Sequence, residues 1–245
     1  MSESDQRRGD VSSHPPRTVL ITGAAGNLGR AVTAAFEDAG DRLVLLDRDD
    51  DVLQSAFGGE ARDCLLIAAD LLDPSAVDAA VAQATQRFGR IDVLCNLAGG
   101  FAMGEAVHQT SDKTWDFLFD LNARALLNVV RAVVPQMIEH GGGKIVNVGA
   151  FAALRGAAQM GAYTASKSAV IRLTEAMSAE LREQGVNVNC VLPTIIDTPQ
   201  NRSAMPDADP AKWVAPKDLA SVIAFLASDK ARAVHGAALP VTGLS

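Results

Sequence analysis

Short runs of apolar residues alternate with longer stretches of helical periodicity from Thr18 to the end of the chain. The runs are continuous rather than alternating, which is typical of strands covered on both faces of a sheet. They predict strands at Thr18–Ile21, Leu43–Leu46, Cys64–Ala68, Ile91–Cys95, Lys144–Val148, Val186–Leu192 and Ala238–Val241. The stretches between them predict helices near residues 28–39, 75–88, 112–139, 162–184 and 216–228. Because strands separated by helices form βαβ units, we expect an α/β fold: a doubly wound parallel sheet of about seven strands with helices on both faces.

This pattern begins only after a leader of different composition. Residues 1–17 are polar and charged and contain prolines, so we expect them to form a disordered leader without the apolar stretch of a secretory signal. No repeat or linker-like stretch interrupts residues 18–245, which favours a single domain. No apolar run approaches about 18 residues, so we expect no transmembrane helix.

Composition and charge exclude several classes of partner. The formal net charge of −7 argues against a nucleic acid or an anionic membrane surface. The three cysteines are far apart and lie in apolar runs, which favours buried, reduced thiols in a cytoplasmic protein. The four histidines show no metal-ligand spacing, so we expect no metal site.

The first predicted strand leads directly into a glycine loop with the spacing G-x-x-G-x-x-G, formed by Gly23, Gly26 and Gly29. Glycine is needed where a backbone turns sharply, approaches a pyrophosphate, or packs a helix against a strand. The N-terminus of the following helix offers unpaired N–H groups to phosphate oxygens. Glycines also mark ordinary turns, but this position between a strand and a helix favours a Rossmann-type nucleotide site.

Two acidic residues follow the next two predicted strands. Asp47 ends the second strand, where a carboxylate can accept both hydroxyls of an adenosine ribose and repel a 2′-phosphate. NADH is therefore favoured over NADPH, although the adjacent Arg48 could pair with a 2′-phosphate and leaves NADP possible. Asp70 follows the third strand, where it could bond the adenine amino group or simply begin a turn.

Tyr163 and Lys167 are candidate catalytic residues because a spacing of four places both on one helix face. An ammonium beside a phenol favours the phenolate and lowers the tyrosine pKa, which suits a general acid–base. Tyr163 is also the only tyrosine in the chain. A Tyr/Lys pair alone is more often a surface contact, but the glycine loop upstream favours the catalytic interpretation.

Taken in order, these motifs resemble those of the short-chain dehydrogenase/reductases. The shared order is the glycine loop, Asp70-Leu71, Asn96-Leu97-Ala98-Gly99, Asn122, Tyr163-x-x-x-Lys167 and Pro193…Thr198, and it covers essentially all of residues 18–245. The resemblance implies hydride transfer between a nicotinamide cofactor and a small substrate. It implies that Tyr163 exchanges a proton with the substrate, that Lys167 holds the nicotinamide ribose, and that Asn122 anchors a water in a proton relay.

The resemblance also implies a set of cofactor contacts, with NAD as the expected cofactor. Within this set, Thr198 would bind the nicotinamide carboxamide, and residues 96–99 would line the adenosine side. The full set is Gly23, Gly26, Asn27, Leu28, Gly29, Asp47, Asp70, Leu71, Asn96, Ala98, Gly99, Tyr163, Lys167, Pro193, Ile195 and Thr198. Helices 112–139 and 162–184 commonly form subunit contacts in this family, so a homodimer or homotetramer is expected, whereas the alternative is that both helices simply pack on the sheet.

One position departs from the family pattern. A serine usually stands about 13 residues before the tyrosine and holds the substrate carbonyl, but counting back from Tyr163 gives Ala150. No Ser or Thr lies between Gly149 and Tyr163. Loss of one donor at a reacting oxygen can lower a rate by ~10²–10³. Either the enzyme is impaired, or its substrate does not need this hydrogen bond.

A narrower resemblance, to the quinonoid dihydropteridine reductases, favours the second option. It rests on Ala150, on the sequence Gly99-Gly100-Phe101, and on the late segment D-T-P-Q-N-R that contains Asn201. An electron-poor pterin ring needs stacking and a proton more than an oxyanion clamp, and Phe101 would supply the stacking face. Phe101, Ala150 and Asn201 are therefore the candidate substrate residues. A phenylalanine stands here where this resemblance leads us to expect a tryptophan.

Two alternatives stay open. The first is an enzyme that acts on ordinary carbonyl or alcohol substrates despite Ala150, and the second is a regulatory protein that binds NADH without turnover. The retained Tyr163, Lys167 and Asn122 argue against the regulatory protein, because a pure binder has no need of a proton relay.

Overall fold

The computed structural model describes residues 15–245 except 60 and 61. All but the last three residues of the predicted leader lie outside the described residues. The seven predicted strands are confirmed, with ends that differ by at most two residues. They are β1 (Thr18–Thr22), β2 (Arg42–Asp47), β3 (Cys64–Ala68), β4 (Val93–Asn96), β5 (Gly143–Val148), β6 (Val186–Pro193) and β7 (Ala238–Val241).

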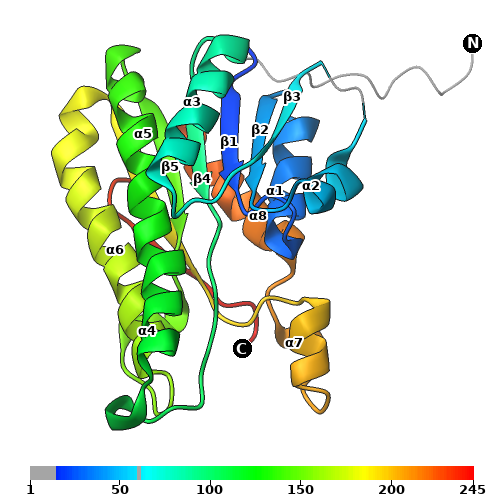
Figure 1. The fold of residues 1–245 in the computed structure, drawn as a ribbon, viewed down its shortest axis with the longest axis vertical. Helices are drawn as coiled ribbons and strands as arrows, with labels where there is room; N and C mark the ends of the chain where they lie inside the picture. Colours follow the sequence, from blue (N-terminus) through cyan, green and yellow to red (C-terminus); the bar gives the residue numbers. More distant parts are fainter. Residues whose placement is uncertain (1–14, 60–61) are drawn as a thin grey trace, which may run out of the picture.

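The strands form one parallel sheet in the order β3-β2-β1-β4-β5-β6-β7, which confirms the predicted doubly wound fold. The chain reverses its direction of winding between β1 and β4, and ligands of such sheets bind outside the carboxyl ends at this point. These carboxyl ends point toward the lower half of Figure 1, where α7 and the loop after β4 project from the sheet.

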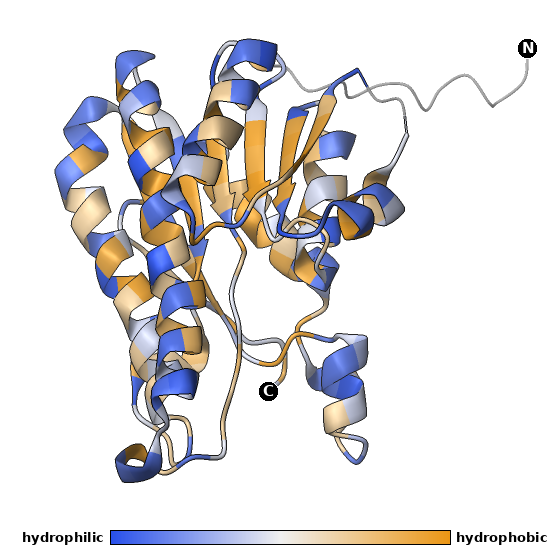
Figure 2. Ribbon diagram, in the orientation of Figure 1, coloured by the Kyte–Doolittle hydropathy of each residue, from blue (hydrophilic) through white to orange (hydrophobic). Residues whose placement is uncertain are grey.

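Helices cover both faces of the sheet (Figure 1). One apolar core lies between the sheet and α3, α5 and α6, and a second lies between the sheet and α1, α2 and α8. The apolar strands between these layers are visible in Figure 2. The helices are α1 (Asn27–Asp38), α2 (Asp50–Phe57), α3 (Pro74–Phe88), α4 (Asp112–Phe119), α5 (Ala125–Glu139), α6 (Gly161–Leu181), α7 (Pro199–Ala204) and α8 (Pro216–Leu226).

The helix predicted over 112–139 is wrong as one continuous α-helix. A π-helical turn at Asp120–Arg124 separates α4 from α5. The Asn122 side chain in this turn bonds both backbone groups of Gly100, which ties the interruption to the loop after β4. Two helices, α2 and α7, are not predicted by the sequence pattern because they have eight and six residues and begin at polar caps.

The apolar positions of α4 and α5 divide between core and surface. Leu126, Val130 and Val133 pack in the core, as the alternative of simple sheet packing predicts. Trp115 is instead 45% exposed and stacks on Phe119 with ring centroids 4.3 Å apart. Within the described part of the chain, no helix is both long enough and apolar enough to span a bilayer.

Candidate active site

The glycine loop after β1 forms a cradle in which side chains would not fit. A Cβ on Gly29 would stand 2.3 Å from the carbonyl oxygen of Gly23 and 2.4 Å from that of Ala24. Gly23 has a φ of +65°, and a Cβ there would meet the backbone of Ala98 at 3.0 Å. The loop is therefore packed tightly between β1, α1 and the end of β4, and only glycine permits this approach.

The N-terminus of α1 has free donors. Its N-cap, Gly26, has no side chain to accept a hydrogen bond, and the first turn carries no acidic residue. The first N–H groups of the helix, on Asn27, Leu28 and Gly29, therefore remain available, and together with the helix dipole they suit a phosphate group. These residues fit the pyrophosphate of a dinucleotide.

The end of β2 lies against the glycine loop. Asp47 accepts a hydrogen bond from the backbone N–H of Ala25 at 3.0 Å through Oδ2 and one from Arg48 at 2.8 Å through Oδ1. Its carboxylate is half-exposed, so further acceptor positions remain for ribose hydroxyls. Arg48 is exposed beside it.

The residues after β3 and β4 complete this edge of the sheet. Asp70 accepts from the N–H of Leu72 at 2.9 Å, so it begins a turn, and the carbonyl of Leu71 accepts from Asn128. The hydroxyl of Thr22 accepts from the backbone N–H groups of Leu97 and Ala98, which joins the end of β1 to the end of β4. Asn96 is buried and donates to Asn147.

Lys167 and Asn122 meet beside Gly99. The Lys167 Nζ and the Asn122 Oδ1 each lie 2.9 Å from the point that a Cβ on Gly99 would occupy. Asn122 donates to the hydroxyl of Ser166 at 3.0 Å, and that hydroxyl donates to the carbonyl of Tyr163 at 2.9 Å. The π turn, the loop after β4 and the first turns of α6 are thereby fixed as one unit.

The electrostatics of the Tyr163–Lys167 pair differ from the expectation. Burial raises the pKa of Tyr163 to about 12 and lowers the pKa of Lys167 to about 8. The expectation that the ammonium lowers the tyrosine pKa is wrong for this structure. Lys167 is 6% exposed, and its Nζ donates to the carbonyl of Val148 at 2.9 Å. The protonated phenol is therefore the stable form, which suits a proton donor.

The substrate side of Tyr163 is apolar. Phe101 packs edge-on against the Tyr163 ring, with ring centroids 4.8 Å apart and an interplanar angle of 81°. Phe101 and Met103 are each 56% exposed, and Phe151 is 41% exposed. Ala150 is buried at the start of the short turn Phe151–Leu154 and offers no side-chain donor. A molecule bound in front of the phenol would meet mainly apolar surface.

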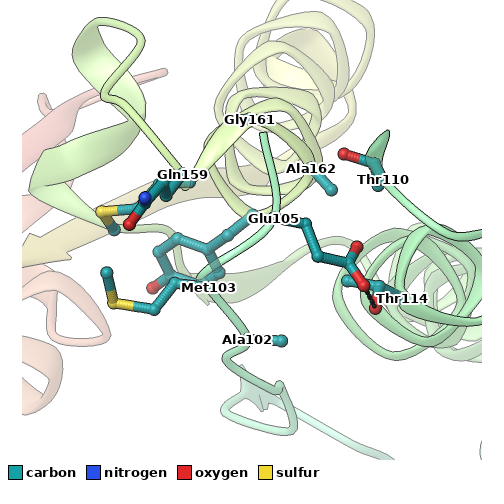
Figure 3. A pocket seen from close by; sticks show the side chains of 10 residues that line it. Ala102, Met103, Glu105, Thr110, Thr114, Gln159, Gly161 and Ala162 are labelled. Atoms are coloured by element: carbon teal, nitrogen blue, oxygen red, sulfur yellow. Dashed lines mark hydrogen bonds between the residues drawn. The ribbon is translucent and has the colours of Figure 1, made fainter. Parts of the chain in front are cut away.

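A small cavity of about 10 Å³ adjoins Tyr163 and contains polar residues that the sequence analysis missed (Figure 3). Glu105 accepts from the N–H and the hydroxyl of Ser111 and from the hydroxyl of Thr114, and these bonds lower the pKa of its carboxyl. Glu105 therefore fixes the loop after β4 to the start of α4. Gln159 lies at the opposite end of the cavity in Figure 3.

The segment after β6 forms a flap over this edge of the sheet. Thr198 caps α7 by accepting from the N–H of Asn201, whose amide donates to the carbonyl of Ile196 at 2.8 Å. Ile195 accepts from Val214, and Pro193 pairs with Val241. The amide of Asn201 is thus engaged within its own segment, and Asn201 does not line the cavity beside Tyr163.

A side-chain hydrogen bond joins this flap to the glycine loop. Asn27 donates to the Oε1 of Gln200 at 2.8 Å, although the two residues are 173 positions apart. Gln159 belongs to no motif, and Gln200 lies in the late segment D-T-P-Q-N-R without a role assigned to it, so spacing gave no signal for either residue. Ser166 could have been found because it lies on the same predicted helix between Tyr163 and Lys167.

Comparisons with known proteins agree with this geometry. The sequence profile of the short chain dehydrogenases matches residues 17–209. The oxidoreductase UcpA of Salmonella typhimurium is 34% identical, over 90% of each chain. The D-threitol dehydrogenase of Mycolicibacterium smegmatis is 33% identical, over 93% of this chain and 92% of its own.

A solved structure extends the likeness to the fold. The 3-ketoacyl-(acyl-carrier-protein) reductase of Brucella melitensis, determined in complex with NADH, superposes with a TM-score of 0.83 and 29% sequence identity. The match covers 93% of this chain and 97% of the reductase.

Proposed function

This chain belongs to the short chain dehydrogenase family, and from this premise we propose that it is an NAD(H)-dependent oxidoreductase acting on a small substrate with an apolar or planar face. The observation that carries the proposal is the convergence of Lys167 and Asn122 at Gly99, in a unit that includes Tyr163. A protein that only binds a nucleotide has no need to bury an ammonium beside the expected nicotinamide position.

Some residues of the site would bind the cofactor, and Tyr163 would transfer a proton to the substrate. The glycine loop and the N-terminus of α1 would hold the pyrophosphate, Asp47 the adenosine ribose, and Lys167 the nicotinamide ribose. When bound, the nicotinamide supplies or accepts the hydride. Tyr163 would donate the proton during reduction, and its raised pKa keeps the phenol protonated at neutral pH. Asn122 would hold the loop after β4 in place through its two bonds to Gly100.

The first substrate to test is a quinonoid dihydropterin. Two features support it: the exposed Phe101 ring beside Tyr163, and Ala150, which leaves no hydroxyl to clamp a carbonyl oxygen. A planar, electron-poor ring gains from aromatic contact and needs a proton donor. An ordinary ketone or alcohol is the second candidate, and it is supported by the relative from Mycolicibacterium smegmatis, which is named a D-threitol dehydrogenase.

These candidates can be separated by NADH oxidation. The purified protein would be assayed anaerobically with freshly generated quinonoid dihydropterin and with acetophenone, an ordinary ketone, after subtraction of the uncatalysed rates. We expect saturable oxidation with at least one of the two. Activity only with the pterin supports pterin reduction, and activity only with the ketone supports the second candidate. Tight NADH binding without turnover contradicts the proposed function and favours a regulatory protein.

Cofactor preference depends on Asp47. Replacing Asp47 with Ala is expected to raise the Kd for NADH by about 10- to 100-fold, because a hydrogen bond to a charged group is lost. The Kd for NADPH should rise less, since the repulsion of a 2′-phosphate disappears too. Fluorescence titration of both cofactors measures the ratio. Asp47→Asn, which retains an acceptor for the N–H of Ala25, separates the charge from the loop contact. An unchanged NADH-to-NADPH ratio in both variants contradicts the assignment.

We also propose that the chain assembles as a homodimer or homotetramer through α4, α5 and α6. The exposed Trp115 and Phe117 on α4 support this proposal, because large aromatic side chains on one helix are a costly surface to leave in water.

A further inference from the structure

Two polar groups that line the cavity beside Tyr163 have no hydrogen-bond partner among the described residues. They are the Tyr163 hydroxyl and the side-chain amide of Gln159. The other polar residues of its lining are engaged: Glu105 with Ser111 and Thr114, and Thr110 with the carbonyl of Ala106. The cavity has room for about one water-sized group, so it presents one phenol and one amide to a single oxygen atom of a bound molecule.

The backbone holds Gln159 in a conformation that costs energy. Its φ is +61°, and it is the one non-glycine residue with a positive φ in the part of the chain that the structure describes. Gln159 is exposed, and a glycine would relieve this strain, so the glutamine is a backbone outlier that motivates a hypothesis of function. The carbonyl of Gln159 accepts from the N–H of Gly104 at 2.9 Å, which anchors this strained position to the loop after β4.

The other polar groups near Tyr163 cannot take the place of the missing serine. The hydroxyls of Ser166 and Ser168 donate to backbone carbonyls, and the amide of Asn147 donates to Thr174 within the core. Ala150 contributes no donor. In Figure 3 the carboxylate of Glu105 is turned toward Thr114, away from Gln159.

We propose that the Nε2 of Gln159 donates a hydrogen bond to the substrate oxygen that receives the proton of Tyr163, and so replaces the hydroxyl that Ala150 lacks. The proposal rests on the proposed function and names its ligand class: a carbonyl oxygen carried on an apolar or aromatic group. Such a donor acts most strongly as negative charge develops on the oxygen during reduction. It makes ordinary carbonyl chemistry compatible with an alanine at position 150.

The test uses binding, so that it does not depend on turnover. Benzamide presents a carbonyl oxygen on an aromatic ring and is not reduced, and its affinity for the NADH-saturated protein can be measured by calorimetry. Gln159→Glu keeps the size of the side chain but cannot donate at neutral pH, and Gln159→Gly removes the amide while relieving the backbone. Both variants are expected to weaken benzamide binding about tenfold, with NADH affinity unchanged within twofold. Adding Ala150→Ser to Gln159→Gly should restore most of the loss.

The outcomes separate this proposal from the proposed function. Benzamide affinity that is equal in parent and variants, or absent in the parent, overturns the role of Gln159. A loss of NADH affinity of the same size would show a structural role and overturns it as well. If the variants lose benzamide binding while the parent never oxidises NADH, Gln159 binds the carbonyl and the hydride-transfer proposal fails alone.

Discussion

Replacing Tyr163 with phenylalanine is expected to lower kcat for NADH-driven reduction by about a thousandfold and to leave NADH affinity within twofold. Among the hydroxyls that line this cavity, only the Tyr163 phenol is free to reach a substrate, because those of Thr110 and Thr114 donate within the protein. A positioned general acid contributes roughly 10²–10⁴ in rate. The aromatic ring, and with it the contact to Phe101, is retained in the variant. The measurement is steady-state NADH oxidation with the better of the two test substrates, together with fluorescence titration of NADH.

The matched control is Glu180→Ala, because Glu180 is exposed at the far end of the same helix, α6. This control should retain full activity. The pH dependence adds a second check. The pKa of Tyr163 is raised to about 12, so the phenol stays protonated below pH 10 and should not limit reduction there. If Tyr163→Phe retained more than a tenth of the parent kcat, the role of Tyr163 as proton donor would be contradicted.

The strands of this protein were predictable because each is a short apolar run bounded by polar or turn-forming residues. The register of β1 with β4, by contrast, was not, although it decides where the glycine loop meets Ala98. The π turn at Asn122 could not be predicted from the sequence either, since the apolar periodicity of 112–139 continues through it. It depends on the bonds between Asn122 and Gly100, which lie 22 residues apart and come together only in the folded chain.

In the candidate site, too, the features that local sequence determines were predicted, and those that depend on distant contacts were not. Motif spacing predicted roles for Tyr163, Lys167 and the glycine loop, because covalent distance along a helix or a tight turn fixes their geometry. Burial is not a local property, so the direction of the two pKa shifts could not be read from a spacing of four. Gln159 escaped prediction for a related reason. Its significance lies in a backbone angle and in the absence of a hydroxyl at position 150, and neither forms a pattern.

Lys167 is expected to reduce the stability of the cofactor-free protein. Its pKa falls from an ordinary value of 10.5 to about 8, equivalent to roughly 3 kcal/mol of unfavourable charge burial. Replacing it with methionine should therefore abolish turnover and yet stabilise the fold at pH 7. The gain will be smaller than the full penalty, because the carbonyl of Val148 loses its donor at a cost of about 1–3 kcal/mol. Urea denaturation of both proteins measures the difference.

The pH dependence of that difference identifies its cause. Below pH 8 the ammonium is charged in the folded and the unfolded chain, so the penalty is fully present and the variant has its largest advantage. Between pH 8 and pH 10.5 the folded chain releases the proton while the unfolded chain keeps it, so the parent gains stability relative to the variant. The exposed Lys217, changed to methionine, should show no such trend. If the stability difference between parent and Lys167→Met is the same at pH 7 and pH 9.5, the buried charge is not its source, and Lys167 is instead held at a site that solvates it well.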